Sequence, residues 1–290
     1  MRIGAFVGFG AHTSPELVAS TGRIAEERGL HSLWCPEHVL VFREYEARYP
    51  YTADGKMPGG AIGLIDPFTA LTWIAAHTKR IRLGTGVCLV PQRNPVYTAK
   101  HVADLDFLSG GRVDFGVGIG WLREEFEALQ VPFEQRAART RDYVELMQRL
   151  WCDESPRHEG PFHVLPECVF GPKPVQRPHP PLYFGGNSEP ALRRVADLGQ
   201  GWYGHDLRPE EAAPHLATLD GLLAERGRDR AGVQRIVSPL FKPVDRSDLE
   251  RYGELGFDQL LLPLVAGDLD GLERRADALT ELARDWISEE

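Results

Sequence analysis

The chain has 290 residues, of which 42% are hydrophobic and 26% are charged, a composition typical of a folded globular protein. Its 42 acidic and 33 basic residues give a net charge of −9, which argues against a nucleic-acid partner because such a partner requires a basic face. No apolar run approaches the roughly 18 residues of a membrane-spanning helix, so we expect a cytoplasmic protein that does not bind membranes.

Short apolar runs alternate with longer amphipathic segments along the chain. In the first half, this alternation predicts, in chain order, a strand at 3–8, a helix at 14–28, a strand at 32–35, a helix at 66–77, a strand at 81–87, a helix at 95–108, a strand at 113–117, and helices at 121–129 and 136–151. Asp66-Pro67 is a typical helix start, and Ser109-Gly110-Gly111 is a typical helix end.

The second half continues the alternation. It predicts a strand at 182–184, a helix at 189–198, a strand at 201–203, a helix at 209–226, a strand at 236–241, a helix at 247–255, a strand at 259–262 and a helix at 269–287. Two long stretches show neither the helical nor the strand periodicity of apolar residues. They are 38–66 after the second strand, and the proline-rich 157–179 after the fourth, which we interpret as a hairpin or irregular excursion. Loops of such length are usually functional lids or insertions.

Eight strands, each followed by at least one helix, predict an α/β fold with parallel strands and right-handed crossovers. Eight repeats favour a closed (β/α)₈ TIM barrel; an open doubly wound sheet is the alternative. The length prior of about 150 residues per domain would allow two domains. No composition break divides the chain, however, so we expect a single domain over residues 1–290.

The residue spacings typical of several common kinds of site are absent from this sequence. The cysteines are widely spaced, with no Cys-x-x-Cys pair, which predicts buried reduced thiols instead of disulfides or a zinc site: Cys35, Cys88, Cys152 and Cys168. The ten histidines show no His-x-x-x-His or His-Glu-x-x-His spacing, so we expect no metal site. The absence of a Gly-x-Ser-x-Gly motif argues against a serine hydrolase.

Two glycine-rich turns follow neighbouring predicted strands, where active sites of parallel barrels lie. Gly118-Ile119-Gly120, with Trp121 after it, follows the fourth strand, and Gly185-Gly186-Asn187-Ser188 follows the fifth. Backbone N–H groups of such turns can bind a phosphate. One turn alone is explained by a tight connection that needs glycine, whereas two on the same barrel face favour an anion shared between them.

His38 directly follows the second strand, next to Glu37. A histidine titrates near neutrality and can donate a proton or a hydrogen bond; the alternative is a histidine that caps the mouth of the long loop. His205-Asp206, after the sixth strand, is a weaker candidate of the same kind. Three tryptophans at predicted strand ends could line a pocket for a flat ligand: Trp34, Trp121 and Trp202.

Longer motifs then resemble a known family. The run 103–113, the turn 116–121 and Glu125-Phe126 are similar to the signature of the bacterial luciferase-like flavin and deazaflavin oxidoreductases. So are the stretches 171–176, 180–186 and 197–202. The resemblance extends from the first strand to about Gly204.

This resemblance implies a (β/α)₈ barrel with a tricyclic redox ring in its mouth and the phosphate of that cofactor between the turns 118–121 and 185–188. It implies that the turn Thr85-Gly86-Val87, after the third strand, backs the ring through a non-proline cis peptide at Gly86-Val87. The family's acid–histidine pair corresponds to Glu37-His38, with Glu in place of the frequent Asp.

The short length and the Gly-x-Gly-Trp turn are more similar to oxidoreductases that use coenzyme F420, a deazaflavin, than to the longer monooxygenases. We therefore expect hydride transfer between F420 and a small organic substrate. His38 would hydrogen-bond the ring or substrate and assist proton transfer, and Glu37 would set its charge. The alternatives are a monooxygenase that uses reduced FMN and oxygen, a barrel that binds flavin without catalysis, and a non-redox enzyme acting on a phosphorylated metabolite. The last alternative is disfavoured, because such enzymes usually bind phosphate at a glycine-rich turn after strands seven and eight, and this sequence has no such turn there.

The loops 38–66 and 157–179 would shape the site for a substrate that the sequence leaves open. Tyr45, Tyr49 and Tyr51 in the first loop either close over a ligand or are simply exposed. Apolar faces near 68–73 and 97–107 predict a homodimer.

Overall fold

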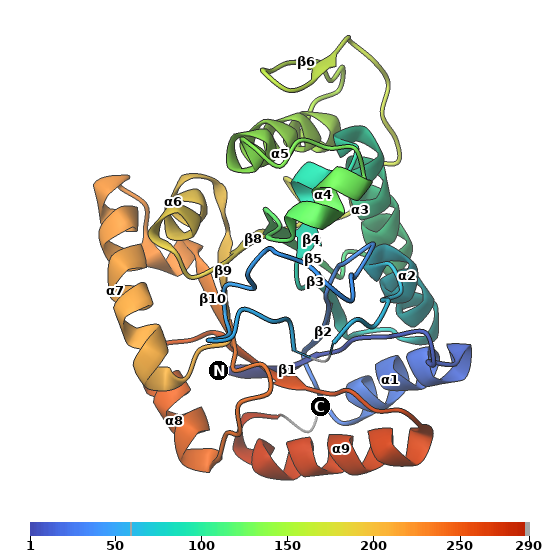
Figure 1. The fold of residues 1–290 in the computed structure, drawn as a ribbon, viewed down its shortest axis with the longest axis vertical. Helices are drawn as coiled ribbons and strands as arrows, with labels where there is room; N and C mark the ends of the chain where they lie inside the picture. The colour runs from blue at the N-terminus through green and yellow to red at the C-terminus, as the bar shows by residue number, and fades with distance from the viewer. Residues whose placement is uncertain (59, 288–290) are drawn as a thin grey trace.

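The computed structural model describes residues 1–58 and 60–287. Eight strands form a closed barrel in which each neighbouring pair is parallel (Figure 1). They are β1 (Arg2–Phe6), β2 (Ser32–Cys35), β3 (Arg82–Thr85), β5 (Val113–Gly118), β8 (Leu182–Gly185), β9 (Gly201–His205), β10 (Gln234–Ser238) and β11 (Gln259–Pro263). The strands follow one another round the ring in this order, and β11 pairs with β1 to close it. The predicted single-domain TIM barrel is confirmed.

Helices surround the barrel (Figure 1): α1 (Pro15–Glu27), α2 (Pro67–His77), α3 (Pro95–Ser109), α4 (Arg123–Ala128), α5 (Arg136–Cys152), α6 (Glu189–Leu198), α7 (Pro209–Glu225), α8 (Arg246–Glu254) and α9 (Leu269–Leu282). Local chemistry sets their ends. The Asp66 side chain accepts hydrogen bonds from the first N–H groups of α2, and Gly110 ends α3 in the left-handed conformation, with φ of 71°.

Large buried side chains fill the barrel interior. Trp34 and Tyr203 stack inside the ring, with centroids 5.5 Å apart, and both are almost fully buried. Gly116 lets β3 and β5 approach each other closely, because a Cβ at this position would lie 1.9 Å from the carbonyl oxygen of Thr85. The interior is therefore a packed core, and ligands have access only at its ends.

Two insertions depart from the regular pattern, as expected. The first leaves the carboxyl end of β2; we call residues 38–58 the strap. The second contains the antiparallel hairpin of β6 (His158–Glu159) and β7 (Val164–Leu165), which stands away from the barrel beyond α5 (Figure 1). A short ninth strand of the main sheet, β4 (Cys88–Leu89), extends the edge of β5 and leads into the 3₁₀ turn η1 (Val90–Gln92).

Some sequence predictions need correction. The strand expected at 236–241 is β10, Gln234–Ser238, since Pro239 follows and Leu240 adopts a positive φ of 55°. The helix expected at 269–287 ends at Leu282, before the separate 3₁₀ turn η3 (Arg284–Trp286); η2 (Arg230–Gly232) is a further such turn. All four cysteines are free, but only Cys35 and Cys88 are buried, whereas Cys152 is exposed and Cys168 half-buried.

Candidate active site

His38 is held at the barrel mouth by a buried carboxylate. Its Nδ1 lies 2.9 Å from Oε2 of Glu125 on α4, a side chain with no exposed surface. Gln92 donates to the same oxygen at 3.1 Å. Burial opposes ionisation of Glu125, but the bond and charge of His38 and further hydrogen bonds outweigh it and lower the pKa of Glu125.

The charge of Glu125 fixes the orientation of the imidazole. An ionised carboxylate can only accept hydrogen bonds, so Nδ1 of His38 carries a proton. Nε2 has no hydrogen-bond partner among the described residues. This nitrogen is the group through which His38 can accept a proton from a bound molecule, or return it.

Glu37 makes its hydrogen bonds with the segment that follows β3. Its Oε2 accepts a hydrogen bond from the Leu89 backbone at 2.5 Å, and its Oε1 accepts one from Nε of Arg93 at 2.5 Å. Arg93 also pairs with Asp66. Successive side chains of an extended segment point in opposite directions, so Glu37 fixes β4 and η1 while the next residue faces Glu125. Glu37 therefore makes no hydrogen bond to His38 in the part of the chain that the structure describes; Glu125 makes that contact.

The turn after β3 lies on the floor of the mouth. The Gly86-Val87 peptide is cis, as the resemblance implied. The Val87 side chain lies against the ends of the next two strands, because a Cβ on Gly118 or Gly185 would come within 2.4 Å or 2.9 Å of its methyl groups. Thr85 faces away, since it is buried and its hydroxyl donates to the Gly116 carbonyl at 2.7 Å.

The two glycine turns meet the mouth from neighbouring strands. Gly120 and Gly186 have φ of 74° and 111°, which favour glycine. The helix expected to start at Trp121 begins only at Arg123 and has six residues, and Ile119 and Trp121 are half-buried in the connection before it.

The second turn leads directly into α6. Ser188 is the N-cap residue of this helix but its side chain makes no capping bond. The Asn187 amide exchanges hydrogen bonds with the His205 backbone, at 2.7 Å and 3.1 Å. Asn187 therefore ties two loops together. The Gly186 backbone is paired as well, because its N–H donates to the Tyr203 carbonyl at 3.3 Å and its carbonyl accepts from Nε1 of Trp202 at 2.9 Å, so the Ser188 side chain is the group available to a ligand.

The strap crosses the mouth. Its residue Tyr49 packs edge-on against Trp121, with centroids 5.2 Å apart, and its hydroxyl lies 3.0 Å from Nε2 of His205. Tyr51 packs against the same histidine, and Tyr45 against Trp121. None of the three tyrosines is exposed, so of the two alternatives the structure favours closure over the mouth.

Three buried polar atoms around this mouth have no hydrogen-bond partner within residues 1–58 and 60–287: Nε1 of Trp121, the hydroxyl of Tyr203 and Oε1 of Gln92. Buried polar atoms are normally paired. The Tyr203 hydroxyl lies 3.6 Å from the position of a Cβ on Gly86, directly below the floor of the mouth. Unpaired polar atoms beside a glycine-lined floor fit a flat polar ligand such as a flavin or deazaflavin ring.

Sequence reasoning identified His38 and the glycine turns but missed Glu125 as a site residue, and it missed Gln92 entirely. Glu125 lies within one of the family motifs, which was the only signal for it. Gln92 follows a strand end through the short turn η1, and nothing in its neighbours distinguishes it.

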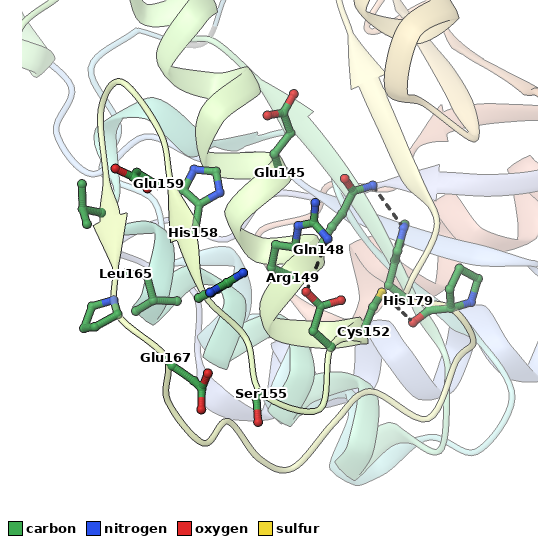
Figure 2. A pocket seen from close by; sticks show the side chains of 15 residues that line it. Glu145, Gln148, Arg149, Cys152, Ser155, His158, Glu159, Leu165, Glu167 and His179 are labelled. Atoms are coloured by element: carbon green, nitrogen blue, oxygen red, sulfur yellow. Dashed lines mark hydrogen bonds and ion pairs between the residues drawn. The ribbon is translucent and has the colours of Figure 1, made fainter.

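A separate cleft lies between α5 and the β6–β7 hairpin (Figure 2), with a volume of about 1210 Å³. Several of its polar side chains are paired locally: Arg149 with Asp153, Gln148 with His179, and His158 with Asp142. It contains none of the predicted site residues. No group of three potential metal ligands occurs in the part of the chain that the structure describes, and no helix there is long and apolar enough to cross a bilayer.

Comparison with known proteins gives relatives that differ in their cofactor. The chain is 35% identical to an uncharacterized protein of Mycobacterium tuberculosis over 84% of this chain and 85% of that protein. It is 30% identical to the F420-dependent glucose-6-phosphate dehydrogenase of Kineococcus radiotolerans, over 77% of this chain and 63% of that protein. It is 29% identical to an FMNH₂-dependent dimethylsulfone monooxygenase of Pseudomonas putida, over 45% of this chain and 36% of that protein.

Solved structures share the fold over the whole chain. Monooxygenase RslO1 of Streptomyces bottropensis superposes with a TM-score of 0.78 at 21% identity, covering 99% of this chain and 100% of that one. The F420-dependent tetrahydromethanopterin reductase of Methanopyrus kandleri gives 0.76 at 15% identity, with coverage of 99% and 100%. The family model described as luciferase-like monooxygenase matches residues 1–280. The chain therefore belongs to the luciferase-like monooxygenase family of oxidoreductases.

Proposed function

We propose that the protein is an F420-dependent oxidoreductase that exchanges hydride between the deazaflavin and a small organic substrate at the mouth of the barrel. The observation that carries this proposal is the His38–Glu125 pair, whose free imidazole nitrogen lies at a mouth with unpaired polar atoms and a glycine-lined floor. The F420-dependent relative is similar over a larger share of this chain than the FMNH₂-dependent one, which supports the choice of cofactor.

In this proposal the turn 85–87, the turn 118–121 and the turn 185–188 hold the cofactor. When bound, the deazaflavin supplies the carbon centre that accepts or donates hydride. The protein supplies position: Val87 supports the floor, and the glycines at 118 and 185 leave room for its methyl groups. His38 accepts or donates the proton that accompanies hydride transfer, and Glu125 holds its ring in one tautomer.

Fluorescence quenching with each cofactor tests this proposal. Purified protein is titrated with F420 and, separately, with FMN. We expect tighter binding of F420. Tighter binding of FMN would instead favour the second candidate, a monooxygenase that uses reduced FMN and oxygen, which the Pseudomonas relative supports. Binding of either cofactor without turnover across a broad substrate panel would favour the third, a flavin-binding barrel without catalysis.

We also propose a homodimer. The outer faces of α2 and α3, which pack side by side, carry large hydrophobic side chains that are 46% to 70% exposed: Trp73, Tyr97, Phe107 and Leu108. An apolar surface of this kind on neighbouring helices is typical of an interface between copies of a chain.

A further inference from the structure

The second half of the strap is held by a histidine that the proposed function leaves without a role. The Tyr49 hydroxyl and Nε2 of His205, the last residue of β9, lie 3.0 Å apart and share a hydrogen bond. Tyr51 packs edge-on against the same imidazole, with ring centroids 4.8 Å apart. His205 therefore contacts the strap through both a polar atom and the face of its ring.

The backbone around His205 is fixed as well. The His205 carbonyl accepts a hydrogen bond from the Asn187 amide at 2.7 Å, and the His205 N–H donates to Oδ1 of Asn187 at 3.1 Å. The next residue, Asp206, has φ of 56°, a left-handed conformation that costs free energy in a residue other than glycine. Lys242 donates to the Asp206 carbonyl at 2.7 Å. Such strain persists only where the surroundings impose it, so the loop holds the imidazole in one place.

The hydrogen bond between Tyr49 and His205 joins opposite sides of the barrel. The strap leaves the end of β2, and β9 is four strands from β2 in either direction round the ring. Among the residues that the structure describes, the strap's other hydrogen bonds to the barrel all go to Glu124 and Glu125 of α4. Without the bond to His205, the strap would therefore be hydrogen-bonded to the barrel through α4 alone.

We propose that His205 is a positioning residue that holds the strap closed over the mouth, and that its hydrogen bond to Tyr49 is the contact that breaks when a ligand enters or leaves. A single neutral hydrogen bond shifts an equilibrium by only about twofold to tenfold, so this contact can open while the barrel stays folded. Closure of such a segment excludes water from the reacting groups and retains the bound molecule. The proposal rests on the proposed function and adds to it the residue that keeps the site closed.

Limited trypsin digestion of the ligand-free protein tests the contact without any cofactor. Tyr49→Phe removes the hydroxyl and keeps the ring that packs against Trp121. We expect cleavage after Arg48, which is exposed in the strap, to become about twofold to tenfold faster. Tyr51→Phe is the matched control, because the Tyr51 hydroxyl makes no hydrogen bond within residues 1–58 and 60–287. It should be cleaved like wild type, and equal acceleration in both variants would overturn the proposal.

A double-mutant cycle separates loss of this hydrogen bond from a general loosening of the loops. His205→Phe keeps a ring beside Tyr51 and removes Nε2. Alone, it should accelerate cleavage about as much as Tyr49→Phe. The double variant should be cleaved no faster than either single variant, because the same contact is lost only once. Effects that multiply in the double variant, or unchanged cleavage in either single variant, would overturn the proposal.

The release rate of a bound ring measures what closure does at the site. Stopped-flow fluorescence follows the dissociation of F420, or of FMN if that ring binds instead, from wild type and from Tyr49→Phe. We expect release to be about twofold to tenfold faster in the variant. Unchanged release together with faster cleavage would show that the strap does not retain the ring, and would overturn its role in closure. If neither ring binds wild type, the proposed function fails, whereas the trypsin comparison still decides whether His205 holds the strap.

Discussion

At the scale of single residues, the site depends on one hydrogen bond between distant segments of the chain. Glu125 accepts from His38 and also from the backbone of Val39 and Leu40, at 2.7 Å and 3.1 Å. The same carboxylate therefore sets the imidazole tautomer and fixes the start of the strap. Loss of its negative charge should affect chemistry more than cofactor affinity.

Glu125→Gln tests this role. An amide can present either its oxygen or its NH₂ group to Nδ1, so the imidazole is no longer held in one tautomer. We expect kcat to fall about tenfold to a hundredfold, less than the roughly 10²–10⁴-fold contribution of a general acid–base group itself, because His38 is kept; cofactor affinity should stay within about twofold. Steady-state kinetics and fluorescence titration measure the two quantities. Glu124→Gln, which leaves His38 untouched, is the control, and an equal loss in both variants would contradict the assignment.

Gly116→Ala tests the close approach inside the barrel. The new Cβ would lie 1.9 Å from the Thr85 carbonyl oxygen, so β3 and β5 must separate. We expect a loss of about 2–3 kcal/mol in the free energy of unfolding. Gly221 in α7 has open space around it, and Gly221→Ala should instead stabilise by about 0.5–1 kcal/mol. Urea denaturation distinguishes these outcomes, and similar curves for both variants would refute the packing argument.

At the scale of elements, the strap is attached to α4 by carboxylates. Glu124 accepts hydrogen bonds from the backbone of Glu46 and Ala47, at 2.6 Å and 3.1 Å, and Glu125 holds the preceding turn. Removing Glu124 should free the middle of the strap without unfolding the barrel.

Limited trypsin digestion measures this release. In Glu124→Ala we expect faster cleavage after Arg43 and Arg48, which are exposed in the strap, because cleavage requires local opening. The melting temperature should change by less than about 2 °C. Glu127→Ala, an exposed position on the same helix, should cleave like wild type. Unchanged cleavage in Glu124→Ala would show that the strap is held elsewhere.

The bounds of helices and strands were predictable where residues that favour turns flank them in the sequence. The helix at 189–198 and the strand at 32–35 have the predicted bounds, since turn residues flank both. The helix start at 121 was wrong because glycine at 120 and the buried Leu122 extend the connection. His38 and the glycine turns could be predicted because strand ends share one face of a barrel. Glu125 could not be assigned to His38, because their contact spans 87 positions and depends on how α4 packs.

At the scale of the molecule, two half-buried histidines make stability depend on pH. Burial and, to a lesser extent, Lys242 lower the pKa of His205 to about 4; burial and the charges of Arg2 and Arg82 lower that of His31 to about 4. Unfolded histidines titrate near 6.5. The unfolded chain thus binds more protons between pH 6.5 and 4, so stability is full above pH 6.5 and falls as pH decreases through this window.

Each histidine should cost roughly 3 kcal/mol across that window. In His205→Gln we expect the free energy of unfolding to fall less steeply between pH 6.5 and 4 than in wild type. Denaturant unfolding at a series of pH values measures both slopes. His12→Gln, in an exposed loop, should keep the wild-type slope. Parallel slopes for His205→Gln and wild type would show that His205 is not held neutral in the fold.

Self-association is tested at the same scale. Light scattering at micromolar concentration should give the mass of two chains, and Leu108→Glu, which places a charge on the exposed face of α3, should give the mass of one. Leu269→Glu introduces the same charge at an exposed leucine of α9 and should leave the dimer intact. A wild-type protein that is monomeric under these conditions would refute the dimer.

Closure of the barrel places Arg2 beside Gln259, and this has a consequence for biosynthesis. The first strand leaves the ribosome long before the strand that completes its pairing has been made. Until then one edge of β1 presents unpaired N–H and C=O groups, which can pair with the wrong chain. Because the closing contact is among the most distant along the chain, it is also entropically the most costly to form. The barrel therefore cannot close until β11 has left the ribosome, and this is the period in which a chaperone can protect the chain most.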